Sequence, residues 1–385
     1  MLEKERLDIA YSLLKYKDEL FDLYEMLEPY KKPDCCNFIS HMHLGDSFYR
    51  AAMNRDLEEK YGNIHYIINP SAEAIMQLFN ITNYSIFDFN KYLNQKLKTY
   101  FNDEIIFAYT KHLLIQKMFS AVPRTGNFFV IDFDSPYYHK YAEILHKDGF
   151  NFSVMEYNYA CAGILKEKKI NVDDINYPSI TEEVKNKVEQ YGKLKDSILL
   201  LPEASSDVLL DNRVWNNIAL ELNKLGYLVL ENIVNENNHI EGAINLKLDV
   251  NELIQLGMTC HSVFSFRSGL CDILAGKGKN LYVLSSEQRN MDFRRTFSFN
   301  DNFEFNSMGC PVEVFLSNQK QPKLIFNGHN ILKNVNKKYL PKNILKRNLK
   351  KEIIQKIFSI KNQNNHKVIT ILGIKLKFEK KKERK

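Results

Sequence analysis

The sequence predicts an α/β fold made of two consecutive units, each with a parallel sheet covered by helices. From about residue 35 onward, short apolar runs rich in β-branched residues alternate with longer runs whose apolar residues have helical spacing. The alternation restarts near residue 181 with clearer glycine and proline boundaries. A chain of 385 residues is long enough for two such domains with full cores.

We place the first domain at residues 1–176, the second at 177–335, and a basic C-terminal segment at 336–385. The first domain shows a helical pattern over 2–28, 46–60, 70–79, 90–99, 110–119 and between Pro136 and His146. Its strand pattern covers 35–40, 64–68, 127–133 and 152–157.

The second domain repeats this alternation over shorter, better separated segments. Helices are predicted over 181–191, 213–225, 250–256 and 270–275. Strands are predicted over 197–201, 227–231, 242–248, 262–266 and 280–284. The polar and aromatic run 286–307 predicts a loop, and Trp215 on the predicted helix 213–225 is expected in the core.

Composition narrows the class of protein. The 44% hydrophobic and 26% charged content is typical of a soluble globular protein. No run approaches the ~20 apolar residues of a membrane-spanning helix, and the charged N-terminal residues lack the apolar run of a signal peptide. The six cysteines include no Cys-x-x-Cys pair, which predicts buried thiols in a reducing cytosol and argues against zinc.

The net charge of +6 is unevenly distributed along the chain. Residues 341–385 carry 15 Lys and Arg and 3 Glu, a net +12, so residues 1–340 have a net charge of −6. An acidic body argues against nucleic-acid binding. A basic tail that interleaves Lys with Ile, Leu and Phe favours an anionic membrane surface; a helix packed on the first domain with a disordered lysine end is the alternative.

The run from Cys260 to Ala275 predicts a buried strand, a turn at Arg267-Ser268-Gly269 and a helix. Such a turn leaves backbone N–H groups at the helix start, which favour an anion such as a phosphate. The planar guanidinium of Arg267 can donate hydrogen bonds to phosphate oxygens. Asp272 in the first helical turn can accept a hydrogen bond from a sugar hydroxyl. The alternative is an ordinary βα turn with Arg267 in a salt bridge and Asp272 as a helix-start charge.

A second strand–turn–helix run contains His41, His43, Gly45 and Asp46. Gly45 permits a tight turn, and Asp46 or Ser47 can cap the following helix. Asp46 or His43 is a candidate general base, and the alternatives are a plain helix cap and loop histidines. The two histidines with Asp46 lack the fourth ligand and the spacing of a metal site.

Two further loops follow predicted strands. The run Pro202 to Ser206 offers Ser205 and Ser206 to an anion, and Glu203 either contacts a nucleoside or is only solvated. Asp132 and Asp134 have the spacing of an Asp-x-Asp metal motif, but their place before Ser-Pro favours strand termination.

These motifs together resemble the GT-B glycosyltransferases that build bacterial surface polysaccharides, in their heptosyltransferase-like branch. Pro202 to Ser206 and Ser265 to Gly269 stand where that branch has its two donor-side loops, and Gly45-Asp46 is similar to its Gly-Asp turn. The resemblance covers residues 35–60 and 197–285, and residues 365–378 look like tails of surface-glycan transferases. The chain departs from the branch in Arg267 and in lacking a lysine after the Pro loop.

The resemblance implies a GT-B fold, two Rossmann-like domains facing a cleft, with a basic C-terminal helical tail. It implies an inverting, metal-independent hexosyl- or heptosyltransferase that needs no cofactor and moves a sugar from a nucleotide-diphosphate sugar to a lipid-linked or surface glycan of capsule or lipooligosaccharide. Its place would be the cytoplasm, peripheral to the inner face of the cytoplasmic membrane. The implied residues are as follows: Asp46 and His43 for catalysis; Arg267, Ser268, Gly269, Asp272, Ser205, Ser206 and Glu203 for the donor; His41 and Gly45 for the acceptor or the turn.

Other functions remain open on the same residues. A sugar-nucleotide epimerase and a polyol-phosphate transferase both use this fold. A non-catalytic glycan-assembly or glycan-binding protein would keep the fold without the chemistry.

Overall fold

The structure of the chain is a computed structural model. It describes residues 26–40, 44–89, 91–92, 128–130, 158–159, 162, 164, 174–203, 210–233, 236–285, 312–315, 323–340, 358–363, 366–371 and 374–379. Predictions at 90–99, 110–119, 136–146, 152–157 and 286–307, and nearly all of the predicted helix 2–28, lie outside these residues, as do Asp132 and Asp134.

The first sheet has the strand order β3-β2-β1-β4, and its strands pair in parallel. They are β1 (Cys36–Ser40), β2 (Ile64–Ile68), β3 (Tyr84–Ile86) and β4 (Phe128–Val130). Helices α3 (Leu44–Ala52) and α4 (Asn54–Tyr61) connect β1 to β2, and η2 (Pro70–Ala72) with α5 (Glu73–Leu78) leads to β3. The short η1 (Glu28–Tyr30) precedes β1. All five residues of β2 are buried, as expected for an inner strand of a parallel sheet.

The second sheet has the order β10-β9-β8-β5-β6-β7, again with parallel pairs. Its strands are β5 (Ser197–Leu201), β6 (Leu228–Glu231), β7 (Ile244–Asn245), β8 (Ser262–Phe266), β9 (Leu281–Ser285) and β10 (Val312–Phe315). Its helices are α10 (Glu182–Glu189), η4 (Leu194–Asp196), α11 (Asn212–Lys224), η5 (Glu236–Asn238), α12 (Val250–Thr259), α13 (Gly269–Ile273) and η6 (Leu274–Asn280).

Local chemistry sets the ends of these helices. Thr181 caps α10 and Asp211 caps α11 through their side chains. Asp249 and Glu252 form a reciprocal capping box at α12. Gly226 follows α11 with a φ of 88°, a left-handed conformation that glycine adopts without strain.

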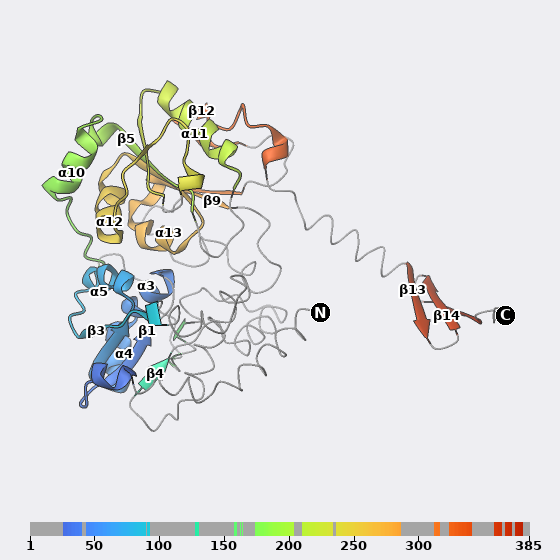
Figure 1. Ribbon diagram of the computed structural model, residues 1–385, viewed down its shortest axis with the longest axis horizontal. Helices are drawn as coiled ribbons and strands as arrows, with labels where there is room; N and C mark the ends of the chain where they lie inside the picture. The colour runs from blue at the N-terminus through green and yellow to red at the C-terminus, as the bar shows by residue number, and fades with distance from the viewer. Residues whose placement is uncertain are drawn as a thin grey trace.

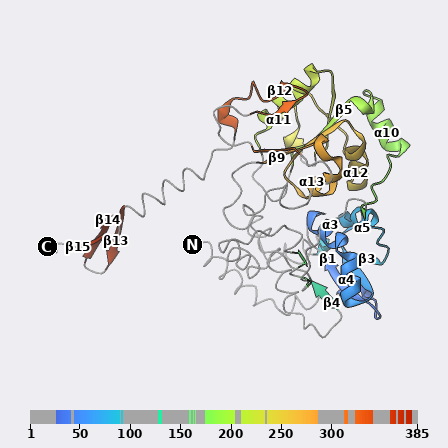
Figure 2. The ribbon, with the colours of Figure 1, turned by 180° about the vertical axis from the view of Figure 1, so that it is seen from behind.

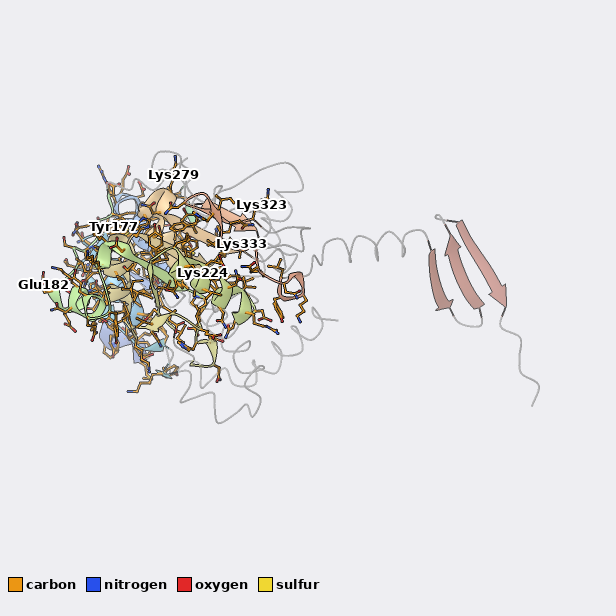
Figure 3. The ribbon with its side chains drawn as sticks, turned by 90° about the horizontal axis from the view of Figure 1, so that it is seen from above. Tyr177, Glu182, Lys224, Lys279, Lys323 and Lys333 are labelled. Atoms are coloured by element: carbon orange, nitrogen blue, oxygen red, sulfur yellow. The ribbon has the colours of Figure 1, made fainter. Side chains whose placement is uncertain are left out.

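Two apolar cores flank the second sheet. One contains Trp215, which is 0% exposed, together with α11 and the segment 323–340 that carries the hairpin β11 (Ile325–Phe326) and β12 (His329–Asn330) and ends with η9 (Lys337–Tyr339). The predicted core place of Trp215 is therefore confirmed. Lys224 of α11 and Lys333 of the segment 323–340 both pair with Glu221 of α11 and lie beside each other (Figure 3).

The other core continues from the first sheet into the second. It joins Phe48 of α3, Ile68 of β2, Ile254 of α12 and Ile273 of α13 in one cluster of buried side chains. Helices α3 and α13 lie between the two sheets and face each other (Figure 1), and the view from behind agrees (Figure 2). Two parallel sheets with α3 and α13 packed between them confirm the predicted α/β fold class and its GT-B-like arrangement.

The chain crosses between the two sheets at residues 175–177. The Asn176 N–H donates to the Leu78 carbonyl at 2.7 Å, on the first-sheet side. The Tyr177 hydroxyl donates to the Ile273 carbonyl at 2.8 Å and accepts from the Gly276 N–H at 3.3 Å, on the second-sheet side. The domain boundary between 176 and 177 stays a prediction.

The C-terminal segment differs from the predicted helical tail. Residues 358–379 form an antiparallel sheet of β13 (Phe358–Gln363), β14 (His366–Ile371) and β15 (Ile374–Glu379), drawn apart from the two parallel sheets (Figure 1). Apolar residues and lysines alternate every second residue from Ile374 to Phe378, which is the period of a strand. The helical prediction for these residues was wrong because it followed charge and composition rather than that period.

Candidate functional site

The carboxyl end of β1 leads into α3. The helix begins at Leu44, so Gly45 lies inside it and Asp46 lies in its first turn, half-buried. The predicted tight turn at Gly45 and the helix cap at Asp46 are therefore wrong. His41 and His43 lie outside the described residues, and their roles stay predictions.

Three buried polar side chains fix α3 against β1. The hydroxyls of Ser40 and Ser47 are 3.1 Å apart, and Nη1 of Arg50 donates to the Ser40 hydroxyl at 3.1 Å. Arg50 is 1% exposed. Hydrogen bonds between buried groups hold the helix at one angle to the strand, because each partner would lose its hydrogen bond if the helix shifted.

The carboxyl end of β8 leads into α13 in the second domain. The Arg267 N–H donates to the Leu284 carbonyl at 2.9 Å, which extends the pairing with β9, and the Arg267 side chain is buried. Ser268 stands at the N-cap position with extended backbone but makes no side-chain capping bond. The strand–turn–helix prediction for this stretch is confirmed, although α13 has only five residues.

Gly269 and Gly45 bring the two helices into backbone contact. A Cβ built at Gly45 would lie 2.8 Å from the Gly269 Cα, and one built at Gly269 would lie 2.5 Å from the Gly45 nitrogen. The start of α13 is thus covered by α3 rather than open on that side. The donor-binding roles of Arg267, Ser268 and Gly269 stay predictions.

A buried tyrosine lies where charges from both domains converge. Tyr49 of α3 is 4% exposed, and burial raises the pKa of its hydroxyl well above the usual value. The charge of Asp272 raises this pKa further, the charge of Arg267 lowers it, and the charge of Asp46 raises it. Two carboxylates and one guanidinium therefore act on one hydroxyl at the boundary between the domains.

Sequence reasoning found Asp46, Arg267 and Asp272 but missed Tyr49. The signal is present in the spacing, since Tyr49 lies four residues after Gly45 and three after Asp46, on the same face of α3. What could not be read from the spacing is that this face meets α13.

The thiol of Cys271, next to the site, is a poor nucleophile at neutral pH. Cys271 donates to the Ser265 hydroxyl at 3.3 Å and to the Phe266 carbonyl at 3.4 Å. Burial raises its pKa, and a protonated thiol is a poor nucleophile. The described cysteines are free thiols, and Cys260 and Cys271 are buried as the sequence predicts.

A second cluster of polar side chains lies at the carboxyl ends of β5 and β6. The Asn238 side-chain amide donates to Oε1 of Glu203 at 2.8 Å. Glu231, fully buried, pairs with His239 and accepts the Ile240 N–H at 2.9 Å. Glu203 is thus held in place rather than only solvated, while Ser205 and Ser206 lie outside the described residues.

In the described part of the chain, no group of three His, Cys, Asp or Glu side chains is arranged to hold a metal ion. None of the helices described is long and apolar enough to cross a membrane.

Comparison with known proteins gives structural likeness only. No family model matches the chain, and no curated protein matches it. A glycosyl transferase family 9 structure from Veillonella parvula is similar at 14% identity and a TM-score of 0.45, over 73% of this chain and 86% of that one. The E. coli ADP-heptose LPS heptosyltransferase II is similar at 14% identity and a TM-score of 0.43, over 83% and 98%.

A third structure is described as a UDP-N-acetylglucosamine 2-epimerase from Listeria monocytogenes. It is similar at 11% identity and a TM-score of 0.36, over 84% of this chain and 90% of that one. Likeness at this level does not choose between transfer and epimerisation, so the function proposed below rests on the residues of this chain.

Proposed function

We propose that this protein is an inverting, metal-independent glycosyltransferase that uses a nucleotide-diphosphate sugar. Its acceptor would be a growing capsule or lipooligosaccharide glycan at the inner face of the cytoplasmic membrane. The observation that carries the proposal is the convergence on Tyr49 of Asp46 from the first domain with Arg267 and Asp272 from the second. In an open α/β sheet, ligands bind at the carboxyl ends of the strands. The helices that follow the carboxyl ends of β1 and β8 contact each other at this place.

The reaction needs a base for the acceptor and positive charge for the leaving group. Asp46, or His43 beside it in sequence, would take the proton of the acceptor hydroxyl. The acceptor oxygen then bonds to the anomeric carbon on the side opposite the diphosphate. The bond from that carbon to the diphosphate oxygen breaks, and the nucleoside diphosphate leaves with the electron pair.

Arg267 is the residue of the second domain suited to that leaving group. A guanidinium forms two parallel hydrogen bonds to phosphate oxygens, and the buried setting of Arg267 strengthens the attraction. Asp272 would accept hydrogen bonds from sugar hydroxyls, and Glu203 would contact the nucleoside from the end of β5. Ser205, Ser206, Ser268 and Gly269 would add hydroxyl and backbone donors.

The test compares donor binding and product mass across matched variants. Arg267→Ala should weaken binding of nucleotide-diphosphate sugars about 10- to 100-fold in calorimetry, the scale of a charged hydrogen bond. Arg267→Lys should keep only part of the wild-type donor affinity, because lysine lacks the planar guanidinium that forms two parallel hydrogen bonds. Arg213→Ala, which removes an exposed arginine of α11, is the control. Wild-type affinity in Arg267→Ala would rule out this donor site.

Asp46→Asn separates an enzyme from a binding protein. The variant should bind the donor normally and lose transfer, measured as the sugar mass added to a glycan acceptor by mass spectrometry. An isomerised free nucleotide sugar in the wild type would indicate an epimerase, and an added polyol phosphate would indicate a polyol-phosphate transferase. An unchanged glycan in cells carrying Asp46→Asn would indicate a binding role or a different base.

A further inference from the structure

Glu231 is a fully buried carboxylate at the last position of β6. Its side chain is 0% exposed, Oε2 accepts the Ile240 N–H at 2.9 Å, and Oε1 pairs with Nδ1 of His239. A buried carboxylate is costly unless it is paired, and apolar residues in place of a buried pair often stabilise a core at least as well. Packing of the core therefore does not explain Glu231, and we look for its role in the histidine that it holds.

Glu231 determines which ring nitrogen of His239 carries a proton. A carboxylate only accepts hydrogen bonds, so Nδ1 is the donor in this pair, and in the neutral ring Nε2 is then the acceptor. The His239 side chain is 56% exposed. Within the described part of the chain, Nε2 forms no hydrogen bond. Glu231 thus holds a largely exposed ring whose second nitrogen is available as an acceptor to a ligand.

His239 follows a strand at the sheet edge where the donor is proposed to bind. Strands β8, β5 and β6 are consecutive in the sheet and pair in parallel, so their carboxyl ends share one edge. Arg267 follows β8, and β6 lies two strand spacings away, about 10 Å. The loops after β5 and β6 are tied together, because the Asn238 side-chain amide donates to Glu203 at 2.8 Å. A diphosphate held by Arg267 can therefore extend its nucleoside along this edge to the two loops.

We propose that His239 contacts the nucleoside of the donor through Nε2, and that Glu231 is a positioning residue that keeps Nε2 an acceptor. The group recognised is a hydrogen-bond donor of the nucleoside, either a ribose hydroxyl or an N–H group of the base. This inference rests on the proposed function for the presence of a nucleotide donor. It adds the residue that distinguishes a nucleoside diphosphate from a bare diphosphate.

Pyrophosphate separates this contact from a structural role, because it carries the diphosphate without the nucleoside. In calorimetry, His239→Ala should weaken binding of the tightest ligand among ADP, GDP, CDP and UDP about 3- to 10-fold, the scale of one hydrogen bond. Its affinity for pyrophosphate should stay within about twofold of wild type, because no hydrogen bond to that ligand is lost. Arg267→Ala should weaken binding of both ligands. His329→Ala, at an exposed histidine of β12, is the control and should change neither affinity.

Glu231→Gln tests the positioning role without changing the size of the side chain. Since the Ile240 N–H needs an acceptor, the amide oxygen takes the place of Oε2 and the NH2 group faces Nδ1 of His239. Nδ1 then accepts and Nε2 carries the proton, so Nε2 changes from acceptor to donor. Glu231→Gln should therefore lose as much nucleotide affinity as His239→Ala and keep its affinity for pyrophosphate. Glu221→Gln, at another buried glutamate that pairs with Lys224, is the control and should bind the nucleotide like wild type.

Deoxynucleotides identify the group that His239 contacts. If the 2′-deoxy or 3′-deoxy form of the tightest nucleotide binds wild type and His239→Ala equally, the partner is the ribose hydroxyl that this form lacks. If the difference between the two proteins persists with both deoxy forms, the partner is an N–H group of the base. Either outcome supports the contact with the nucleoside.

Three results would overturn the proposal. Equal losses of nucleotide and pyrophosphate affinity in His239→Ala would mean that the histidine supports the loops and does not contact the nucleoside. Wild-type nucleotide affinity in His239→Ala would rule out the contact itself. Wild-type nucleotide affinity in Glu231→Gln, with a loss in His239→Ala, would rule out the positioning role of Glu231.

The contact and the proposed function fail in different ways. If His239→Ala lost nucleotide affinity but wild type transferred no sugar, the contact would stand and the glycosyltransferase assignment would fall. If wild type transferred sugar and His239→Ala bound the nucleotide like wild type, the assignment would stand and the contact would fall. A wild-type protein that bound none of the nucleotides would overturn both.

Discussion

At the residue scale, both the missing side chain of a glycine and the buried polar groups of its neighbours determine how α3 packs. Gly45 reads in the sequence as a turn glycine, yet it has helical conformation and is required by the close approach of α13. Arg50 and Tyr49, which read as ordinary helix residues, are buried polar groups of α3, and Arg50 holds the helix against β1 through Ser40. Buried polar groups are costly unless they are paired, so their presence here marks a site rather than a plain core.

Cys260 gives a pH-dependent prediction at the same scale. Burial raises the pKa of its thiol from 9.0 to about 11, partly offset by Lys277. The folded state therefore keeps the proton that the unfolded state loses. This stabilisation is complete below pH 9 and disappears as the pH rises through about 11.

Chemical unfolding between pH 8 and pH 11 measures the effect. Wild type should lose on the order of 2–3 kcal/mol more of its free energy of unfolding over this interval than Cys260→Ala does. Cys35→Ala, at a half-buried thiol, is the control and should follow wild type. Parallel curves for wild type and Cys260→Ala would show that the buried thiol does not titrate in this way.

At the scale of elements, most helices and strands follow from local chemistry. The capping box at α12 joins Asp249 and Glu252 in two reciprocal hydrogen bonds of 2.9 and 3.1 Å. Glu252 also pairs with Lys187 of α10, so the same short segment ties two helices together. The strands buried on both faces are mostly apolar, which is why β2, β5 and β8 were predicted closely.

Asp249→Ala should lower the free energy of unfolding by about 1 kcal/mol, because the Glu252 N–H loses its acceptor. Urea unfolding measures this, with unchanged slope against urea concentration. Glu241→Ala, at an exposed site outside any helix, is the control and should differ little from wild type. A loss no larger than that of the control would mean that the box contributes nothing to stability.

At the scale of the whole molecule, one apolar core runs through both domains and a second covers the far face of the second sheet. The two domains therefore pack against each other and are not only linked by the chain. The candidate site lies beside this shared core, at the carboxyl ends of β1 and β8. The basic charge lies in residues 341–385, with a net +12, and the strands β13 to β15 carry four of its lysines and one Glu.

Deletion of residues 344–385 tests the proposed membrane contact of that segment. Full-length protein should sediment with anionic vesicles at low salt, since each Lys or Arg near an anionic surface contributes about 1 kcal/mol. It should be released at high salt as screening increases, and it should not sediment with neutral vesicles. The truncated protein should stay in solution throughout. Equal sedimentation of both proteins would show that the segment does not bind the membrane.

The sequence by itself determined the α/β class, the order of most described elements and the three charged groups around Tyr49. It could do so because strand and helix periods, capping residues and glycine conformations are decided by neighbours within a few positions. Asp46, Arg267 and Asp272 were found in this way, each from its own strand–turn–helix unit.

Only the tertiary structure decided how these units meet. Gly45 and Gly269 are more than 200 positions apart in the sequence, and their contact depends on the packing of a core shared by two domains. No local pattern encodes a contact of that range, because it depends on the summed shape of all side chains between the sheets. The same reason explains Tyr49, which comes near the charges of Asp272 and Arg267 only when α13 is brought against α3.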